Sequence, residues 1–167
     1  MYEIIPNHFA MKYWDEKLKI PIQLHAISYN KCNFKCGYCN FSNRSFTVKE
    51  YDDVLFVKVI KKLLKDGIYF KFTGGEPTLN PQLYTHLKMI KKMGGKVFLD
   101  TNGSRPDIVE KLCSENLIEV VGLSLKGVTC EMAKENAGVL VDRLVWDNFF
   151  ETLDIVCKYN LKVIVTY

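Results

Sequence analysis

Three cysteines stand close together in the first quarter of the chain, at Cys32, Cys36 and Cys39. Their Cys-x3-Cys-x2-Cys spacing gives one loop room for three thiolates around a single metal cluster. A [4Fe-4S] cluster is usually held by four thiolates. Because no fourth ligand stands nearby, this loop would leave one iron open to a ligand that is not protein. An iron that can bind a small molecule indicates catalysis.

Other chemistries of this loop stay open at the level of the residues. Structural zinc takes four ligands, commonly as two separated pairs, and the nearest histidine, His25, lies upstream in a predicted strand. A redox dithiol of the C-x-x-C type would use Cys36 and Cys39 but would leave Cys32 without a role. Burial of all three cysteines on an apolar face conflicts with the polar residues between them.

A second polar segment, Thr73-Gly74-Gly75-Glu76-Pro77, follows an apolar run that predicts a strand. Two glycines without β-carbons let a ligand approach main-chain carbonyls. Pro77 restricts the exit of the turn, and Glu76 supplies a carboxylate. Such oxygens are acceptors for an ammonium group. The segment therefore fits an amine-binding loop at the end of a strand, and taken alone it also fits an ordinary turn.

Two more polar runs end predicted strands further along the chain. Asp100-Thr101-Asn102-Gly103 closes one strand, and Ser124-Leu125-Lys126 closes the next. Ligand sites of parallel α/β architectures form at the carboxyl ends of the strands. We therefore expect all four segments, the cysteine loop included, to meet at one edge of a sheet.

Together these motifs resemble the radical S-adenosylmethionine (SAM) superfamily. From about Gln23 to Lys126 the chain looks most like the glycyl-radical enzyme activating enzymes that serve pyruvate formate-lyase and anaerobic ribonucleotide reductase. The resemblance implies a [4Fe-4S] cluster on Cys32, Cys36 and Cys39 whose open iron chelates SAM. An electron from the cluster would then cleave SAM to a 5′-deoxyadenosyl radical.

The resemblance also implies which residues contact SAM. In the family the Gly-Gly-Glu-Pro segment binds the amino group, a role that falls here on Gly74, Gly75 and Glu76. Tyr38, directly before the last cysteine, matches an aromatic residue that packs near the adenine. A tyrosine at this place would also fit ordinary packing.

The carboxylate end of SAM lies in the family near an Asp-Thr pair and a following Asp-x-Lys, where acidic groups can hold a monovalent cation. Asp100, Thr101 and Lys126 match this pattern, and Ser124 stands where the second aspartate is expected. A hydroxyl is a neutral ligand, so the cation is an open question in this chain. From its chemistry alone, Asp100 also fits a turn residue that caps the next segment.

Composition fits one globular domain. The chain has 167 residues, 48% hydrophobic and 25% charged, with a net charge of +4. Lysine and arginine are spread along it, so we expect neither a nucleic-acid nor a membrane surface. Without a signal peptide or a long apolar run, we expect a cytoplasmic protein whose cysteines serve metal or catalysis. Cys113, Cys130 and Cys157 lack cluster spacing and are expected to be buried.

Strands and helices alternate along the chain, which predicts parallel βαβ units. We expect an α/β fold, a partial parallel (β/α) barrel of radical SAM type, in residues 22–167, with 1–21 as an N-terminal extension. Only five strands are visible, so we expect either a minimal barrel or a chain that lacks the last β/α unit. The first helix should begin near Thr47, with Glu50 completing a capping box, and the stretch before Val145 should be irregular.

The resemblance implies an enzyme that activates a glycyl-radical enzyme and receives electrons from a flavodoxin- or ferredoxin-type protein. Two alternatives remain. One is a radical SAM reaction on a small molecule or a peptide, such as deazaguanine synthesis. The other is a non-catalytic iron-sulfur or zinc-binding module.

Overall fold

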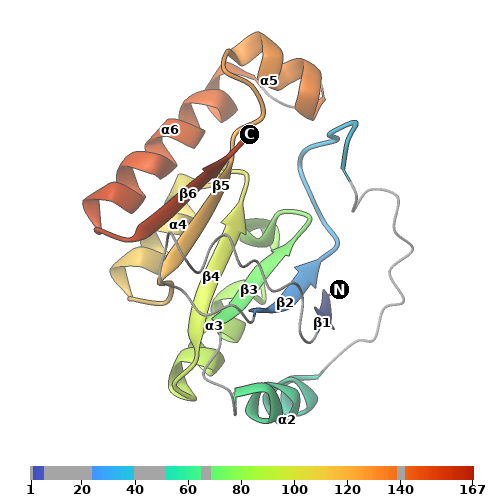
Figure 1. Ribbon diagram of the computed structural model, residues 1–167, viewed down its shortest axis with the longest axis vertical. Helices are drawn as coiled ribbons and strands as arrows, with labels where there is room; N and C mark the ends of the chain where they lie inside the picture. Colours follow the sequence, from blue (N-terminus) through green and yellow to red (C-terminus); the bar gives the residue numbers. More distant parts are fainter. Residues whose placement is uncertain (1, 6–23, 40–51, 65–68, 139–141) are drawn as a thin grey trace.

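A single mixed sheet forms the centre of the fold (Figure 1). The computed structural model describes residues 2–5, 24–39, 52–64, 69–138 and 142–167. Within them the sheet has six strands, and their order in the sheet follows the chain. The strands are β1 (Tyr2–Ile5), β2 (Leu24–Tyr29), β3 (Tyr69–Gly74), β4 (Lys96–Thr101), β5 (Val120–Ser124) and β6 (Lys162–Thr166).

The strands β2 to β6 are parallel neighbours, which confirms the α/β class and the five predicted strands. β1 was not predicted. It lies in the expected N-terminal extension and pairs antiparallel with β2, in a backbone register that sets Tyr2 opposite Tyr29. Pairing of a distant segment with the edge of a sheet is a long-range contact, and four residues alone carry too little pattern to predict it.

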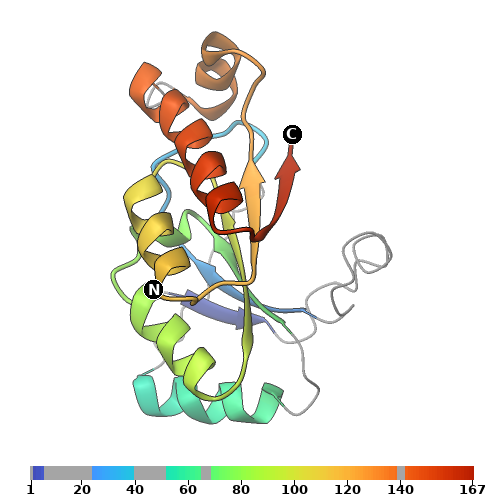
Figure 2. The same cartoon turned by 90° about the vertical axis from the view of Figure 1, so that its left-hand side faces the viewer.

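Helices connect the parallel strands. They are α2 (Asp53–Leu63), the 3₁₀ helix η2 (Pro77–Leu79), α3 (Leu83–Lys92), α4 (Pro106–Ser114), α5 (Cys130–Ala137) and α6 (Arg143–Lys158). Figure 2 shows α3, α4 and α6 together on one side of the sheet. None of the helices in the described residues combines the length and apolar character that crossing a membrane requires.

Alternation along the strands separates the two faces of the sheet. Phe70 and Phe72 of β3 and Leu99 of β4 are fully buried in the main core, against the helices. Phe98, one position from Leu99, belongs instead to a small separate cluster with Val120 and Tyr69. The helix-covered face therefore stabilises the fold, and the opposite face is left to carry polar side chains near the strand ends.

The first helix begins later than predicted. α2 starts at Asp53, and the side chain of Asp52 caps it by accepting a hydrogen bond from the N–H of Leu55 at 2.7 Å. The predicted cap, Thr47 with Glu50, lies outside the described residues. Aspartate caps helices as well as threonine does. Asp52 precedes the first buried residue of the helix, Phe56, by one turn.

The stretch expected to be irregular contains α5. Thr129 caps this helix by accepting a hydrogen bond from the N–H of Met132 at 3.2 Å. Its buried residues are Ala133 and Ala137, which are too small and too few to give the wide apolar stripe that predicts a helix.

The expectation that the scattered cysteines are buried is correct for Cys113 alone. Cys130 is half-buried and Cys157 is exposed. Both lie on helices, where one side faces solvent, and the sequence does not say which side an isolated cysteine takes.

Candidate functional site

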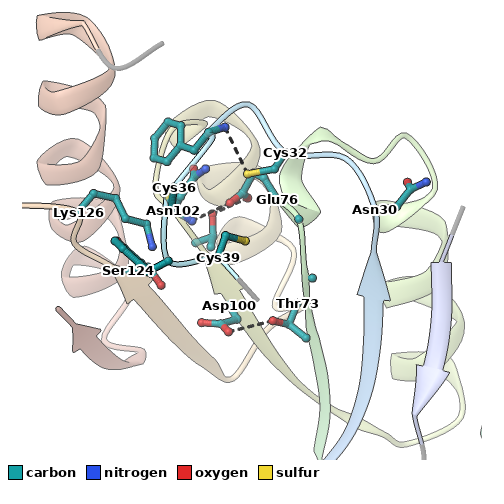
Figure 3. A pocket seen from close by; sticks show the side chains of 15 residues that line it. Asn30, Cys32, Cys36, Cys39, Thr73, Glu76, Asp100, Asn102, Ser124 and Lys126 are labelled. Carbon is teal, nitrogen blue, oxygen red and sulfur yellow. Dashed lines mark hydrogen bonds between the residues drawn. The ribbon is translucent and has the colours of Figure 1, made fainter. Parts of the chain in front are cut away.

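A cavity of about 320 Å³ opens at the carboxyl ends of the parallel strands (Figure 3). This is near the lower limit for ligand pockets, which span roughly 300–1,000 Å³. All the residues predicted to bind the cluster or SAM line it. They are Cys32, Cys36, Tyr38, Cys39, Gly74, Gly75, Glu76, Asp100, Thr101, Ser124 and Lys126.

Four further lining residues had no predicted role, namely Asn30, Phe34, Thr73 and Asn102. Thr73 and Asn102 stand inside the motifs that were recognised, and Asn30 directly follows β2. Their polar side chains at the ends of parallel strands were the signal that would have identified Asn30, Thr73 and Asn102. Phe34, an apolar residue within the cysteine loop, carried no such signal.

Two local hydrogen bonds stabilise the cysteine loop, one of them to a sulfur atom. The N–H of Phe34 donates to Sγ of Cys32 at 3.3 Å, and the N–H of Cys39 donates to the carbonyl of Cys36 at 3.1 Å. Desolvation by the surrounding chain raises the pKa of the Cys32 thiol, although the residue as a whole is exposed. Desolvation also raises the pKa of Cys36, while the charge of Lys126 acts in the opposite direction. Both thiols therefore favour protonation until a metal supplies positive charge.

The start of this loop is joined to the Gly-Gly-Glu segment by backbone contacts. The N–H of Gly75 donates to the carbonyl of Tyr29, and that of Glu76 donates to the carbonyl of Lys31, both at 2.6 Å. A Cβ on Gly75 would lie 2.0 Å from the Lys31 oxygen. Gly74 has a φ of 106°, which disfavours any residue with a side chain. Gly75 therefore makes room for protein backbone, a role that the motif alone did not reveal.

The middle of the cysteine loop is held by α5. The N–H of Lys35 donates to the carbonyl of Ala137, the last residue of that helix, at 2.8 Å. Phe34 is buried in a small cluster with Ala133 and Ala137. The helix that the sequence did not predict is thus part of the frame around the cysteines.

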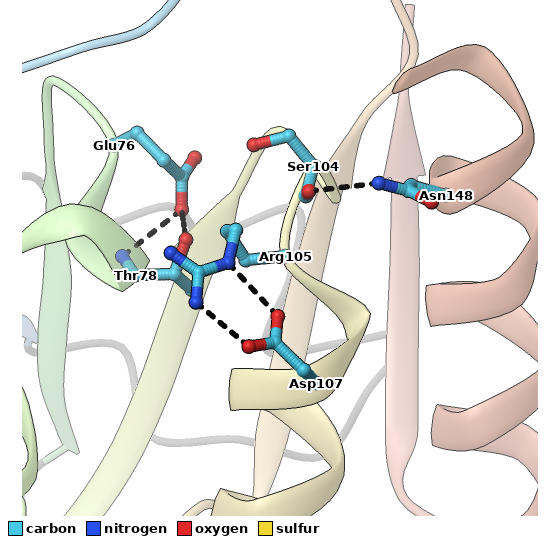
Figure 4. Close-up of polar contacts among 6 residues, drawn as sticks. All are labelled: Glu76, Thr78, Ser104, Arg105, Asp107 and Asn148. Carbon is cyan, nitrogen blue, oxygen red and sulfur yellow. Dashed lines mark hydrogen bonds and ion pairs between the residues drawn. The ribbon is translucent and has the colours of Figure 1, made fainter. Parts of the chain in front are cut away.

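The turn after β4 holds the same loop from another side. Asn33 accepts a hydrogen bond from Nδ2 of Asn102 at 2.9 Å and donates to Oγ of Ser104 at 3.0 Å. Nδ2 of Asn148, on α6, donates to the Ser104 carbonyl at 3.1 Å (Figure 4). The cysteine loop is therefore fixed by elements that come from three distant parts of the chain.

The Glu76 carboxylate ties these loops together from inside. Its Oε1 accepts from the N–H of Thr78 at 3.1 Å and from the hydroxyls of Thr78 and Thr101, both at 2.6 Å. Its Oε2 accepts from the N–H of Asn102 at 2.7 Å. The residue is only 1% exposed. Burial raises the pKa of Glu76, and the hydrogen bonds from Asn102, Thr101 and Thr78 act in the opposite direction.

Asp100 points away from this network. One of its oxygens, Oδ2, lies 3.0 Å from Nζ of Lys71 and accepts from the hydroxyl of Thr73, also at 3.0 Å. Thr101, the next residue, faces Glu76. The Asp-Thr pair was predicted to lie together around one end of SAM. In the structure Asp100 contacts Lys71 and Thr73, whereas Thr101 contacts Glu76. The two side chains separate because successive side chains of a strand point to opposite faces.

The remaining predicted residues line the cavity from β5 and the cysteine loop. The Ser124 hydroxyl lies 3.4 Å from that of Thr166 on β6. Nζ of Lys126 lies 5.7 Å from the ring centroid of Tyr38, within the range of a cation-π contact. Tyr38 is 60% exposed, so its ring can pack on a ligand.

The donors at the cavity fit an iron-sulfur cluster better than a single ion. Within the part of the chain that the structure describes, no three His, Cys, Asp or Glu side chains converge on a point that would suit one ion. Three thiols of one loop do line the same cavity. A cubane holds its thiolates further apart than one metal ion does, and soft thiolates are its usual ligands.

Comparison with known proteins supports this assignment. The sequence profile of the radical SAM superfamily matches residues 26–167. A protein of Methanocaldococcus jannaschii named as a glycyl-radical enzyme activating enzyme is 34% identical over 103 residues, which is 57% of this chain and 40% of that protein. A protein of Saccharolobus solfataricus named as a GTP 3′,8-cyclase is 31% identical over 120 residues, 68% of this chain and 38% of that protein. The chain thus spans less than half the length of these relatives.

Solved structures show the same fold. The structure of anSMEcpe with bound AdoMet, which is SAM, and a peptide matches with a TM-score of 0.63 at 25% identity, covering 83% of this chain and 40% of that one. A structure of TYW1 matches with a TM-score of 0.61 at 20% identity, over 92% of this chain and 58% of that one. The partial barrel is therefore confirmed, and the matched family implies a [4Fe-4S] cluster and SAM as cofactors. This chain belongs to the radical SAM superfamily of enzymes.

Proposed function

We propose that this chain holds a [4Fe-4S] cluster through Cys32, Cys36 and Cys39, binds SAM beside it and cleaves SAM reductively. The observation that supports this proposal is the meeting of the cysteine loop with three separate polar strand ends around one cavity. When bound, the cluster supplies the electron that splits SAM into methionine and a 5′-deoxyadenosyl radical.

The residues around the cavity would position SAM for this reaction. The backbone of Gly74 and Gly75 lines the cavity and offers carbonyl acceptors to the amino group. Glu76, whose two oxygens already accept four hydrogen bonds, would act by holding that segment in place. The ammonium of Lys126 suits the carboxylate, and the exposed ring of Tyr38 suits the adenine.

For the wider reaction, activation of a glycyl-radical enzyme is our first candidate. It is supported by the relative from Methanocaldococcus jannaschii and by the Asp100-Thr101 and Lys126 motif. The substrate would then be a large protein that receives the radical on a glycine. A flavodoxin- or ferredoxin-type protein would supply the electron.

A second candidate is a radical SAM reaction on a small molecule or a peptide. Two observations favour it. The match to the GTP 3′,8-cyclase covers more of this chain, 68%, than the match to the activating enzyme, 57%. The solved structures that match include one bound to a peptide.

Anaerobic assays would separate these reactions. Protein reconstituted with iron and sulfide is given SAM and dithionite, and 5′-deoxyadenosine is measured by chromatography. Iron-loaded protein that forms none would contradict SAM cleavage, and protein that takes up zinc but no iron would indicate the non-catalytic module. A glycyl radical on an added partner, detected by electron paramagnetic resonance, supports activation. Turnover of a small molecule or peptide with no glycyl radical supports the second candidate.

A further inference from the structure

The Lys71 side chain is a charged group on the face of the sheet that carries the cavity, and sequence reasoning gave it no role. Its side chain is only 14% exposed, and its ammonium lies 3.0 Å from Oδ2 of Asp100, whose side chain is 24% exposed. The ammonium also lies 5.0 Å from the ring centroid of Phe98, which fixes it from a second direction. An ion pair shielded in this way is screened little by salt.

The geometry around Asp100 leaves its carboxylate no freedom to turn away from Lys71. Thr73 donates to the same oxygen, Oδ2, at 3.0 Å. The other oxygen, Oδ1, occupies space that a side chain on Gly122 would fill, since a Cβ there would lie 2.7 Å from it. Asp100 is therefore held between β3 and β5 and paired with a fixed positive charge.

These contacts leave little capacity for a metal cation. Among the residues that the structure describes, the carboxylates that line the cavity are Glu76 and Asp100. Glu76 already accepts four hydrogen bonds and is 1% exposed, and Asp100 is neutralised by Lys71. Ser124, at the position where the family resemblance predicts a second aspartate, offers a neutral hydroxyl. In the family the cation is held by acidic groups, and here Ser124 is neutral and the carboxylate of Asp100 is paired with an ammonium. This donor set therefore does not fit the cation that the resemblance predicts.

We propose that the Lys71 ammonium is a built-in counter-ion of the SAM site, which neutralises Asp100 and takes the place of a monovalent cation. Because this ammonium is attached to the chain, its local concentration at Asp100 does not depend on the ions in solution. Lys71 is thus a positioning residue that acts through Asp100. This inference rests on the proposed binding of SAM, and it makes that binding independent of Na⁺ and K⁺.

The first test uses the unmodified, cluster-loaded protein. Its affinity for SAM is measured in sodium chloride and in choline chloride at equal ionic strength, about 0.15 M. We expect the two dissociation constants to agree within about twofold, less than the tenfold that 1.4 kcal/mol would produce. A loss of about tenfold or more in choline would overturn the inference, and this measurement requires no variant to fold.

The second test begins with a direct measurement of the ion, made without SAM. The sodium-23 line width is recorded with the cluster-loaded parent, with Lys71→Met and with Lys71→Met combined with Asp100→Asn. Lys96→Met is the matched control, because the Lys96 ammonium is exposed and lies over Tyr69, 5.6 Å from its ring centroid. We expect broadening in Lys71→Met alone, and a SAM affinity of that variant that falls about tenfold in choline and recovers in sodium.

Each outcome of the sodium measurement decides the role of Lys71. Broadening by the parent that is absent from the double variant, Lys71→Met with Asp100→Asn, would show that the ion binds at Asp100 despite Lys71. Absence of broadening in Lys71→Met would show that sodium does not bind beside Asp100 when the ammonium is removed, so that Lys71 does not replace a cation. Either result overturns the inference. Failure of SAM to bind in any salt would instead contradict the proposed function, and the sodium result would still stand.

Discussion

Substitution of Gly75 by alanine tests the contact between the Gly-Gly-Glu segment and the entry to the cysteine loop. A Cβ at this position would lie 2.0 Å from the carbonyl oxygen of Lys31 and 2.5 Å from its carbonyl carbon. Both are backbone atoms, so no change of rotamer relieves the overlap. The two segments must move apart, and Cys32, which directly follows Lys31, must move with them.

The expected cost follows from the contacts that this movement breaks. The two hydrogen bonds between the segments, Gly75 to Tyr29 and Glu76 to Lys31, are both 2.6 Å long. Each contributes about 0.5–1.5 kcal/mol, and the overlap itself costs about 1–3 kcal/mol, so the free energy of unfolding should fall by roughly 2–6 kcal/mol. Since domains of this size are stable by about 5–15 kcal/mol, a large share of the stability would be lost.

The assay is urea denaturation of the reduced, metal-free protein, followed by iron analysis after anaerobic reconstitution. Gly37→Ala is the matched control, because Gly37 lies in the cysteine loop and a Cβ there meets no atom within 4 Å. We expect the control to stay within about 0.5 kcal/mol of the parent and to keep its iron. If Gly75→Ala also kept the parent's stability and iron content, the close approach would carry no energy and our reasoning would be refuted.

Three further substitutions test other parts of the frame. Cys36→Ala should abolish iron binding and the absorption near about 400 nm, because two thiolates remain in the loop, whereas Cys157→Ala, at an exposed position on α6, should keep both. Glu76→Gln should lower the free energy of unfolding by about 1–3 kcal/mol, because an amide nitrogen opposite the N–H of Asn102 leaves that donor unpaired. Burial raises the pKa of Glu76 above its ordinary value of 4.5. The parent's excess in free energy of unfolding over Glu76→Gln should therefore be full below pH 4.5 and should shrink as the pH rises through the raised pKa. An excess that grows between about pH 5 and 8 would contradict this. Thr129→Ala should cost about 1 kcal/mol through loss of the α5 cap, and equal stability in urea would show that the cap is dispensable.

The sequence alone determined the chemistry of the site and the edge of the sheet where it lies. Thiolates at Cys32, Cys36 and Cys39 share one loop, so their spacing is local and can be read directly. The other motifs each follow an apolar run, and the carboxyl ends of parallel strands meet at one edge. Strand alternation and chain order were therefore enough to predict that Glu76, Asp100 and the cysteines would line one cavity.

The tertiary structure decided how those residues are used, because their partners come from distant parts of the chain. From the sequence we expected Glu76 to bind the amino group of a ligand, yet in the structure it is buried and accepts four hydrogen bonds that connect the loops. Gly75 accommodates the backbone of Lys31, a contact that depends on how closely β2 and β3 approach. The pairing of Lys71 with Asp100 depends on the register of β3 and β4, which sets Phe72 opposite Leu99 and which no local pattern specifies.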